Sequence, residues 1–255
     1  MNYEPTLTTN NKTPAMKKIS LSIMICIAAI VAKAQSELIV DPNAEVRTVS
    51  GSYSSIKVSG GIDLYLSQAD NEAVAVSASE EKFIKRLKTT VDNGVLKIFM
   101  EEEGFLHINT KDRKLKAYVS FKDINKIDAS GACDIHVSGT IAVNTLHLIC
   151  AGASGFKGDV KVNDLEMDLT GASDITISGT ARNVDIQSAG ASDVKGIDLT
   201  TDMCTAKAAG SSDIEITVNK ELNARATGAS SITYRGNGGI KDMHSSGAAS
   251  IRRKS

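Results

Sequence analysis

Three aspartates recur at the same place in a short repeated motif. Asp174, Asp193 and Asp213 each end a four-residue unit that opens with glycine. If the units stack as strands, neighbouring carboxylates lie about 4.8 Å apart, where like charges repel unless they are screened, hydrogen-bonded or bridged by a cation. Two interpretations are open: a row that binds a divalent cation or another ligand, and a row of turn residues in solvent. The second is favoured, because Gly155 and Ser231 interrupt the row and Ca²⁺ takes about six to eight oxygen ligands.

The other residue types that could do chemistry show no recognised spacing. The histidines form no H-E-x-x-H motif, and the sequence has neither a glycine-rich P-loop nor a G-x-S-x-G nucleophile elbow. We therefore predict no catalytic residue, no cofactor and no metal site beyond the candidates in the aspartate row. The histidines are His107, His136, His147 and His244.

Three cysteines follow the N-terminal segment, at Cys133, Cys150 and Cys204. An odd number without C-x-x-C spacing does not predict a disulfide framework, and a free cysteine packs as a small hydrophobic residue. We interpret all three as fillers of the repeat, and whether any two of them pair stays open.

The glycine-led units define an internal repeat. Seven units follow one another at intervals of 18 to 21 residues, and a period near 19 sustained over seven copies is typical of a solenoid. The leading glycines are Gly131, Gly152, Gly171, Gly190, Gly210, Gly228 and Gly247.

Each repeat reads as strands on both sides of its glycine. Apolar residues alternate with polar ones, as in Leu165 and Met167 before Gly171, and in Ile175 and Ile177 after it. No helical spacing is present. We therefore predict an all-β fold, a parallel β-helix with rungs of about 19 residues, at least two strands per unit and, from the crossover rule, a right-handed coil.

The G-A-S-D unit is predicted to be the corner between strands. Glycine adopts positive φ without strain, alanine is expected to fit a tight inward corner, and serine and aspartate side chains can bond backbone N–H groups.

The N-terminal half is less regular but continues the same architecture. Residues 53–66 read as strand, Gly-Gly corner and strand, and a single helical turn is expected from Glu81 to Leu87. Asn93-Gly94 predicts a two-residue hairpin, and Lys116 to Phe121 predicts a further strand. We expect one continuous domain over residues 46–253.

The first 34 residues have the features of a secretory signal peptide. Two lysines follow Met16, the expected true start, then an apolar run over residues 19–31 and an A-x-A site that ends at Ala34. Residues 35–45 read as a linker. The run is too short to span a bilayer, so we expect an exported protein without a transmembrane span after signal removal, located in the periplasm, at the outer-membrane surface or outside the cell.

Composition restricts the function. The formal net charge is −1, from 29 Lys and Arg against 30 Asp and Glu, so we expect no nucleic-acid binding. Polysaccharide-cleaving β-helices need long loops that build a cleft, whereas the repeat length here varies by only three residues. We therefore predict a protein that is not an enzyme.

Three segments together resemble a known family. The residues that carry the resemblance are 56–68, 92–98 and the serial corner units at 130–135 (S-G-A-C-D-I) and 170–175 (T-G-A-S-D-I). Together they are similar to the "putative auto-transporter adhesin, head GIN domain" family over about residues 46–253. The resemblance implies a β-helical fold and an exported location, and it carries over no catalytic residue.

These observations predict a non-catalytic, exported β-solenoid that acts as an interaction or adhesion module of the cell envelope. Its ligand would be a surface protein or polysaccharide. One alternative is a carbohydrate-binding or carbohydrate-active β-helix. Another is a structural protein that assembles into homo-oligomers through its parallel edges.

Overall fold

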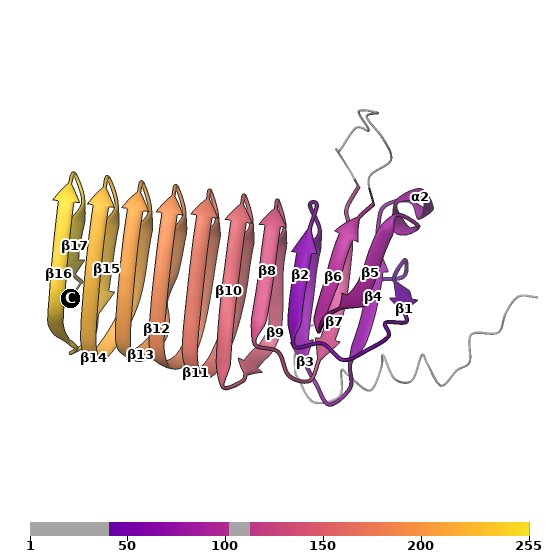
Figure 1. Ribbon diagram of the computed structural model, residues 1–255, viewed down its shortest axis with the longest axis horizontal. Helices are drawn as coiled ribbons and strands as arrows, with labels where there is room; N and C mark the ends of the chain where they lie inside the picture. Colours follow the sequence, from indigo (N-terminus) through magenta and orange to yellow (C-terminus); the bar gives the residue numbers. More distant parts are fainter. Residues whose placement is uncertain (1–40, 102–112, 255) are drawn as a thin grey trace, which may run out of the picture. The chain divides into compact units, whose positions relative to one another are not determined.

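The alternating apolar residues of each unit form strands that pair in parallel with the same segment of the next unit (Figure 1). The computed structural model describes residues 41–101 and 113–254. The chain in these ranges is an all-β parallel solenoid, which confirms the predicted fold class. The predicted signal peptide and most of the predicted linker lie outside the described residues.

The regular rungs consist of long, continuous strands. The four longest strands run from one corner to the next and pair along most of their length. The expectation of at least two strands per unit therefore differs from these rungs, where one strand continues through the bend, although the register shifts there between β12 and β13 and between β13 and β14. These strands are β11 (Gly155–Gly171), β12 (Asp174–Gly190), β13 (Asp193–Gly210) and β14 (Asp213–Gly228).

The remaining rungs are divided at the bend. On one side of the long strands they consist of β8 (Lys126–Gly131), β9 (Asp134–Ala142) and β10 (Thr145–Gly152). On the other side they consist of β15 (Ser231–Arg235), β16 (Gly239–Gly247) and β17 (Ser250–Arg253).

Each rung contributes to two stacks of strands that enclose one core. The first half of β12 points Ile175 and Ile177 inward, and its second half points Val184 and Ile186 inward. All four side chains are buried in the same hydrophobic cluster. Alternate residues point outward, so each outward position forms a row of side chains that crosses successive rungs.

The corners differ from the sequence expectation in one residue. Gly171 has φ +89°, as predicted for a corner glycine, but Ala172 is exposed rather than inward. Ser173 is fully buried, and its hydroxyl donates to the carbonyl of Thr170 at 3.1 Å. Ser173 lies two residues before the inward Ile175, so the in–out alternation of the strand continues into the corner. This alternation places the side chain of serine, and not that of alanine, inside.

The first rung in the sequence is not the first rung in the stack. It consists of β2 (Ser55–Ser59) and β3 (Asp63–Gln68). β2 pairs in parallel with β6 (Val95–Met100) and with β8. β3 pairs in parallel with β7 (Lys116–Phe121) and with β9. Figure 1 shows β2 between β6 and β8, so an early rung is enclosed by later ones.

Antiparallel strands complete the solenoid beside β6 and β7. β5 (Leu87–Asp92) pairs with β6 through the predicted Asn93-Gly94 hairpin, where both residues have positive φ. β4 (Ala73–Ser77) lies between β7 and β1 (Glu45–Arg47).

The predicted helical turn is shorter in the structure. The helix α2 spans Glu81–Ile84, and Leu87 already begins β5. The predicted strand from Lys116 to Phe121 is β7, with the same bounds.

Candidate functional site

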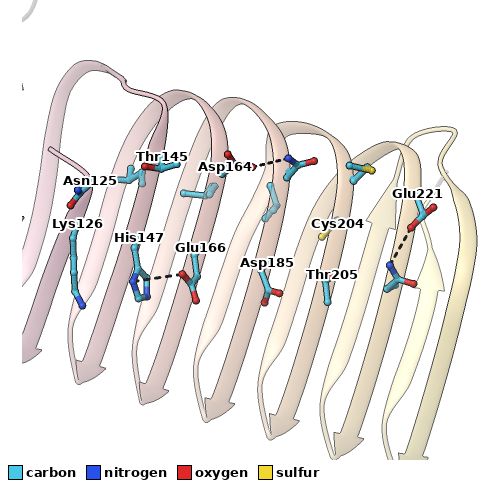
Figure 2. Close-up of a pocket in the computed structure, with 16 residues that line it drawn as sticks. Asn125, Lys126, Thr145, His147, Asp164, Glu166, Asp185, Cys204, Thr205 and Glu221 are labelled. Atoms are coloured by element: carbon cyan, nitrogen blue, oxygen red, sulfur yellow. Dashed lines mark hydrogen bonds and ion pairs between the residues drawn. The ribbon is translucent and has the colours of Figure 1, made fainter. Parts of the chain in front are cut away.

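An open pocket of about 730 Å³ lies on the outer face of the second stack. It crosses the rungs where the second half of each strand begins, just after the bend (Figure 2). We call it the rung groove. Its lining residues include Asn125, His147, Glu166, Asp185, Thr205 and Asn223.

Strand register positions these side chains. His147 of β10 pairs with Glu166 of β11, which pairs with Asp185 of β12, which pairs with Thr205 of β13. Neighbouring strands are about 4.8 Å apart, so the groove presents one polar side chain per strand at a fixed interval.

A second row of polar side chains borders the groove beside the bend. Asn163 Nδ2 donates to Asn144 Oδ1 at 2.7 Å, and Asn183 Nδ2 donates to Asp164 Oδ1 at 2.7 Å. The Oδ1 atoms of Asn183 and Asp185 are shielded from solvent and have no hydrogen-bond partner in the structure. Beside the groove, these two oxygens are therefore buried acceptors without a donor.

One histidine in the groove lies between two carboxylates. His147 Nε2 is 2.8 Å from Asp168 Oδ2, and Nδ1 is 3.7 Å from Glu166 Oε2. In the described part of the chain, this is the one place where three potential ligand atoms of His, Cys, Asp or Glu come within 4.8 Å of one another. The arrangement offers one nitrogen and two oxygens to a metal ion.

The predicted aspartate row forms as expected at its centre. Asp174 pairs with Asp193 and Asp193 with Asp213, while Gly155 and Ser231 interrupt the row on either side. No hydrogen bond or ion pair involves these three carboxylates within residues 113–254, and they form no three-ligand cluster. A cation or ligand role for the row stays a prediction.

Two further aspartates lie beyond Gly155, on the side of the row away from Asp174. Asp134 pairs with Gly155, and Asp63 precedes Leu64, which pairs with Ile135. Burial, with the nearby charge of Asp134, raises the pKa of Asp63.

An aromatic stack crosses the outer face of the first stack of strands. Tyr118, Tyr65 and His136 follow one another along neighbouring strands, and successive ring centroids are 5.2 Å apart. The Tyr118 hydroxyl donates to Asp41 Oδ2 at 2.8 Å. Sequence reasoning missed this stack, because it depends on the pairing of β3 with both β7 and β9. The rings cover one another's faces, so the stack is a poor platform for sugar rings.

The three cysteines are free and buried. Burial raises the pKa values of Cys150 and Cys204 to about 12, and it also raises the pKa of Cys133. This agrees with their interpretation as packing residues of the repeat, because a protonated, enclosed thiol is a poor nucleophile.

The family of the chain is shown by a match over most of its length. A model of the family described as "Putative auto-transporter adhesin, head GIN domain" matches residues 52–238. The chain belongs to this family. No curated protein matches it.

Solved structures share the fold of this GIN-domain chain. A "putative adhesin" from Bacteroides fragilis has a TM-score of 0.75 at 17% identity, over 83% of this chain and 96% of that one. A "putative lipid binding protein" from Parabacteroides distasonis has a TM-score of 0.65 at 22% identity, over 84% and 97%. A "putative adhesin" from the same species has a TM-score of 0.60 at 19% identity, over 83% and 93%.

The described residues contain no helix with the length and apolar character needed to cross a membrane.

Proposed function

We propose that this GIN-domain protein is an exported, non-catalytic interaction module of the cell envelope, which binds an extended surface polymer along the rung groove. The observation that supports this function is the groove itself. It is open, crosses several rungs, and offers one polar side chain per strand at a constant spacing. An extended ligand can place one polar group opposite each of these side chains.

The nature of the groove favours binding over catalysis. Catalysis requires a group matched in pKa and held within reach of a substrate that is shielded from water. The groove is open, and most of its polar residues come from the faces of strands rather than from loops that close over a substrate. Its regular rows instead suit recognition of an extended chain.

The test is a binding assay on arrays of surface polysaccharides and envelope proteins, with two matched variants. Thr205→Arg places a long side chain in the groove row, where Thr205 lines the pocket. Thr176→Arg makes the same change on an outward, exposed position of the other stack. We expect Thr205→Arg to abolish binding and Thr176→Arg to leave it unchanged.

A third variant tests the aspartate row separately. The triple substitution of Asp174, Asp193 and Asp213 by asparagine removes the charges without changing the shape of the row. Loss of binding in this variant alone would move the ligand site from the groove to the row. Absence of binding to every polymer, or equal loss in both arginine variants, would contradict the proposed function.

A further inference from the structure

We propose that His147, Glu166 and Asp168 form a binding site for a divalent transition metal of the zinc class. One ligand atom from each residue lies within 4.8 Å of the other two. A set of one imidazole nitrogen and two carboxylate oxygens suits zinc, whereas calcium and magnesium prefer oxygen ligands alone. The site does not depend on whether the groove binds a polymer.

The strands hold the three residues close together before any ion binds. Glu166 and Asp168 are two residues apart on β11, so both point outward on the same face. His147 is the register partner of Glu166 on β10. The backbone therefore fixes the origin of every ligand side chain, and only side-chain rotations are needed to bind the metal.

One potential ligand atom from each residue is within reach of a single ion, since all three lie within 4.8 Å of one another. Zinc bonds of about 2.0–2.2 Å at tetrahedral angles place ligand atoms roughly 3.4 Å apart. Asp168 Oδ2 is 2.8 Å from His147 Nε2, whereas Glu166 Oε2 is 3.7 Å from the other ring nitrogen, Nδ1. One ion can bond to only one of these nitrogens, so the carboxylate on the other side of the ring has to rotate toward it. The side chains are 26% exposed for His147, 33% for Asp168 and 50% for Glu166, so a water molecule can take the fourth position.

The two carboxylates also place negative charge beside both nitrogens of His147. A neutral imidazole carries a proton on one nitrogen only, so its other nitrogen directs a lone pair at a carboxylate, whichever tautomer forms. A positive ion relieves this repulsion. Asp185, next to Glu166 in the groove row, adds a further negative charge and has a shielded Oδ1 without a hydrogen-bond partner. On the other side of the cluster, Lys126 of β8 is the register partner of His147 and places a positive charge in the same row.

Calorimetric titration of the purified, tag-free protein with zinc chloride tests the proposal. We expect one zinc ion per chain, with binding weakened roughly tenfold or more in His147→Gln and in Asp168→Asn. His244→Gln removes an exposed histidine of β16 and is the matched control, with unchanged affinity expected. Circular dichroism without metal confirms that each variant keeps its strands.

Two further measurements make the result decisive. Replacing Lys126 by methionine removes a repelling charge and is expected to tighten zinc binding. Calcium chloride is expected not to displace zinc. Equal zinc binding by the protein and His147→Gln, equal loss in His244→Gln, or tighter binding of calcium than of zinc would each overturn the proposal and leave the cluster as a contact between a histidine and two carboxylates of the outer face.

Discussion

At the scale of single residues, burial of the cysteines is expected to lower the free energy of unfolding at alkaline pH. Unfolded thiols titrate near 9.0, whereas the folded pKa values of Cys150 and Cys204 are about 12. As pH rises above 9, the unfolded chain loses these protons first, so the stabilisation is complete below pH 9 and is lost between pH 9 and 12. At about pH 10.5 the loss amounts to about 2 kcal/mol per thiol relative to about pH 8.

Urea unfolding under reducing conditions at about pH 8 and about pH 10.5 measures this loss. The double variant Cys150→Ala, Cys204→Ala is less stable at the lower pH because it loses packing, but its free energy of unfolding is expected to fall less between the two pH values. The same decrease in the protein and the variant would show that other groups cause the alkaline loss.

The pairing within the cluster of His147, Glu166 and Asp168 could have been found from the sequence by aligning the repeats on their corner glycines. His147 lies five residues before Gly152, and Glu166 lies five residues before Gly171. Equal offsets predict register partners, which the structure confirms. What the sequence does not contain is the direction of the side chains, which places the imidazole between two carboxylates. The aspartate row, in contrast, can be predicted because its residues are identical in successive units.

At the scale of the element, the corner glycines are held by two separate constraints. Gly190 has φ +91°, and a Cβ there would lie 2.4 Å from the carbonyl oxygen of Gly171 in the rung beside it. The close approach accompanies a hydrogen bond from Ala191 N–H to the same oxygen at 2.8 Å. A side chain at Gly190 would therefore strain its own backbone and also separate two rungs.

The variants Gly190→Ala and Gly139→Ala distinguish these constraints. Gly139 also has positive φ, +79°, but a Cβ added there would meet nothing within 4 Å, so we expect a loss of about 1–2 kcal/mol from backbone strain alone. For Gly190→Ala we expect about 2–5 kcal/mol, because the overpacking of the rungs adds to that strain. Chemical unfolding measures both, and equal losses would mean that the rungs separate at little cost.

The sequence predicts the repeating elements well and the irregular ones poorly. Seven units of similar length supply seven independent observations of the same rung, so the parallel pairing follows from the pattern. The alternation of inward residues through Ser173 and Ile175 could also have shown that serine, and not alanine, is the inward residue of the corner. The position of β2 between β6 and β8 could not be predicted, because β2 has apolar alternation that fits beside any rung.

At the scale of the whole molecule, the rungs differ in how well their neighbours protect them. β12 pairs with β11 on one side and with β13 on the other. Among the described strands, β16 pairs with β14 alone, and all nine of its residues are exposed. Ile240 and Met243 of β16 are 48% and 40% exposed, so little apolar burial holds this strand in place.

Hydrogen exchange followed by mass spectrometry is expected to show this gradient. Amides of β16 should exchange at least about ten times faster than those of β12, since local opening of β16 breaks one ladder and uncovers little apolar surface. Uniform exchange along the solenoid would mean that it opens only as a single cooperative unit.

The enclosed rung of β2 and β3 affects the order in which the chain can fold during synthesis. A ribosome releases the N-terminus first, yet β2 and β3 each need a partner that is translated later, β8 and β9, which end at Gly131 and Ala142. Assembly cannot proceed rung by rung from the N-terminus. The chain must emerge as far as Ala142 before this rung is closed on both sides, and only the following repeats can then be added one at a time.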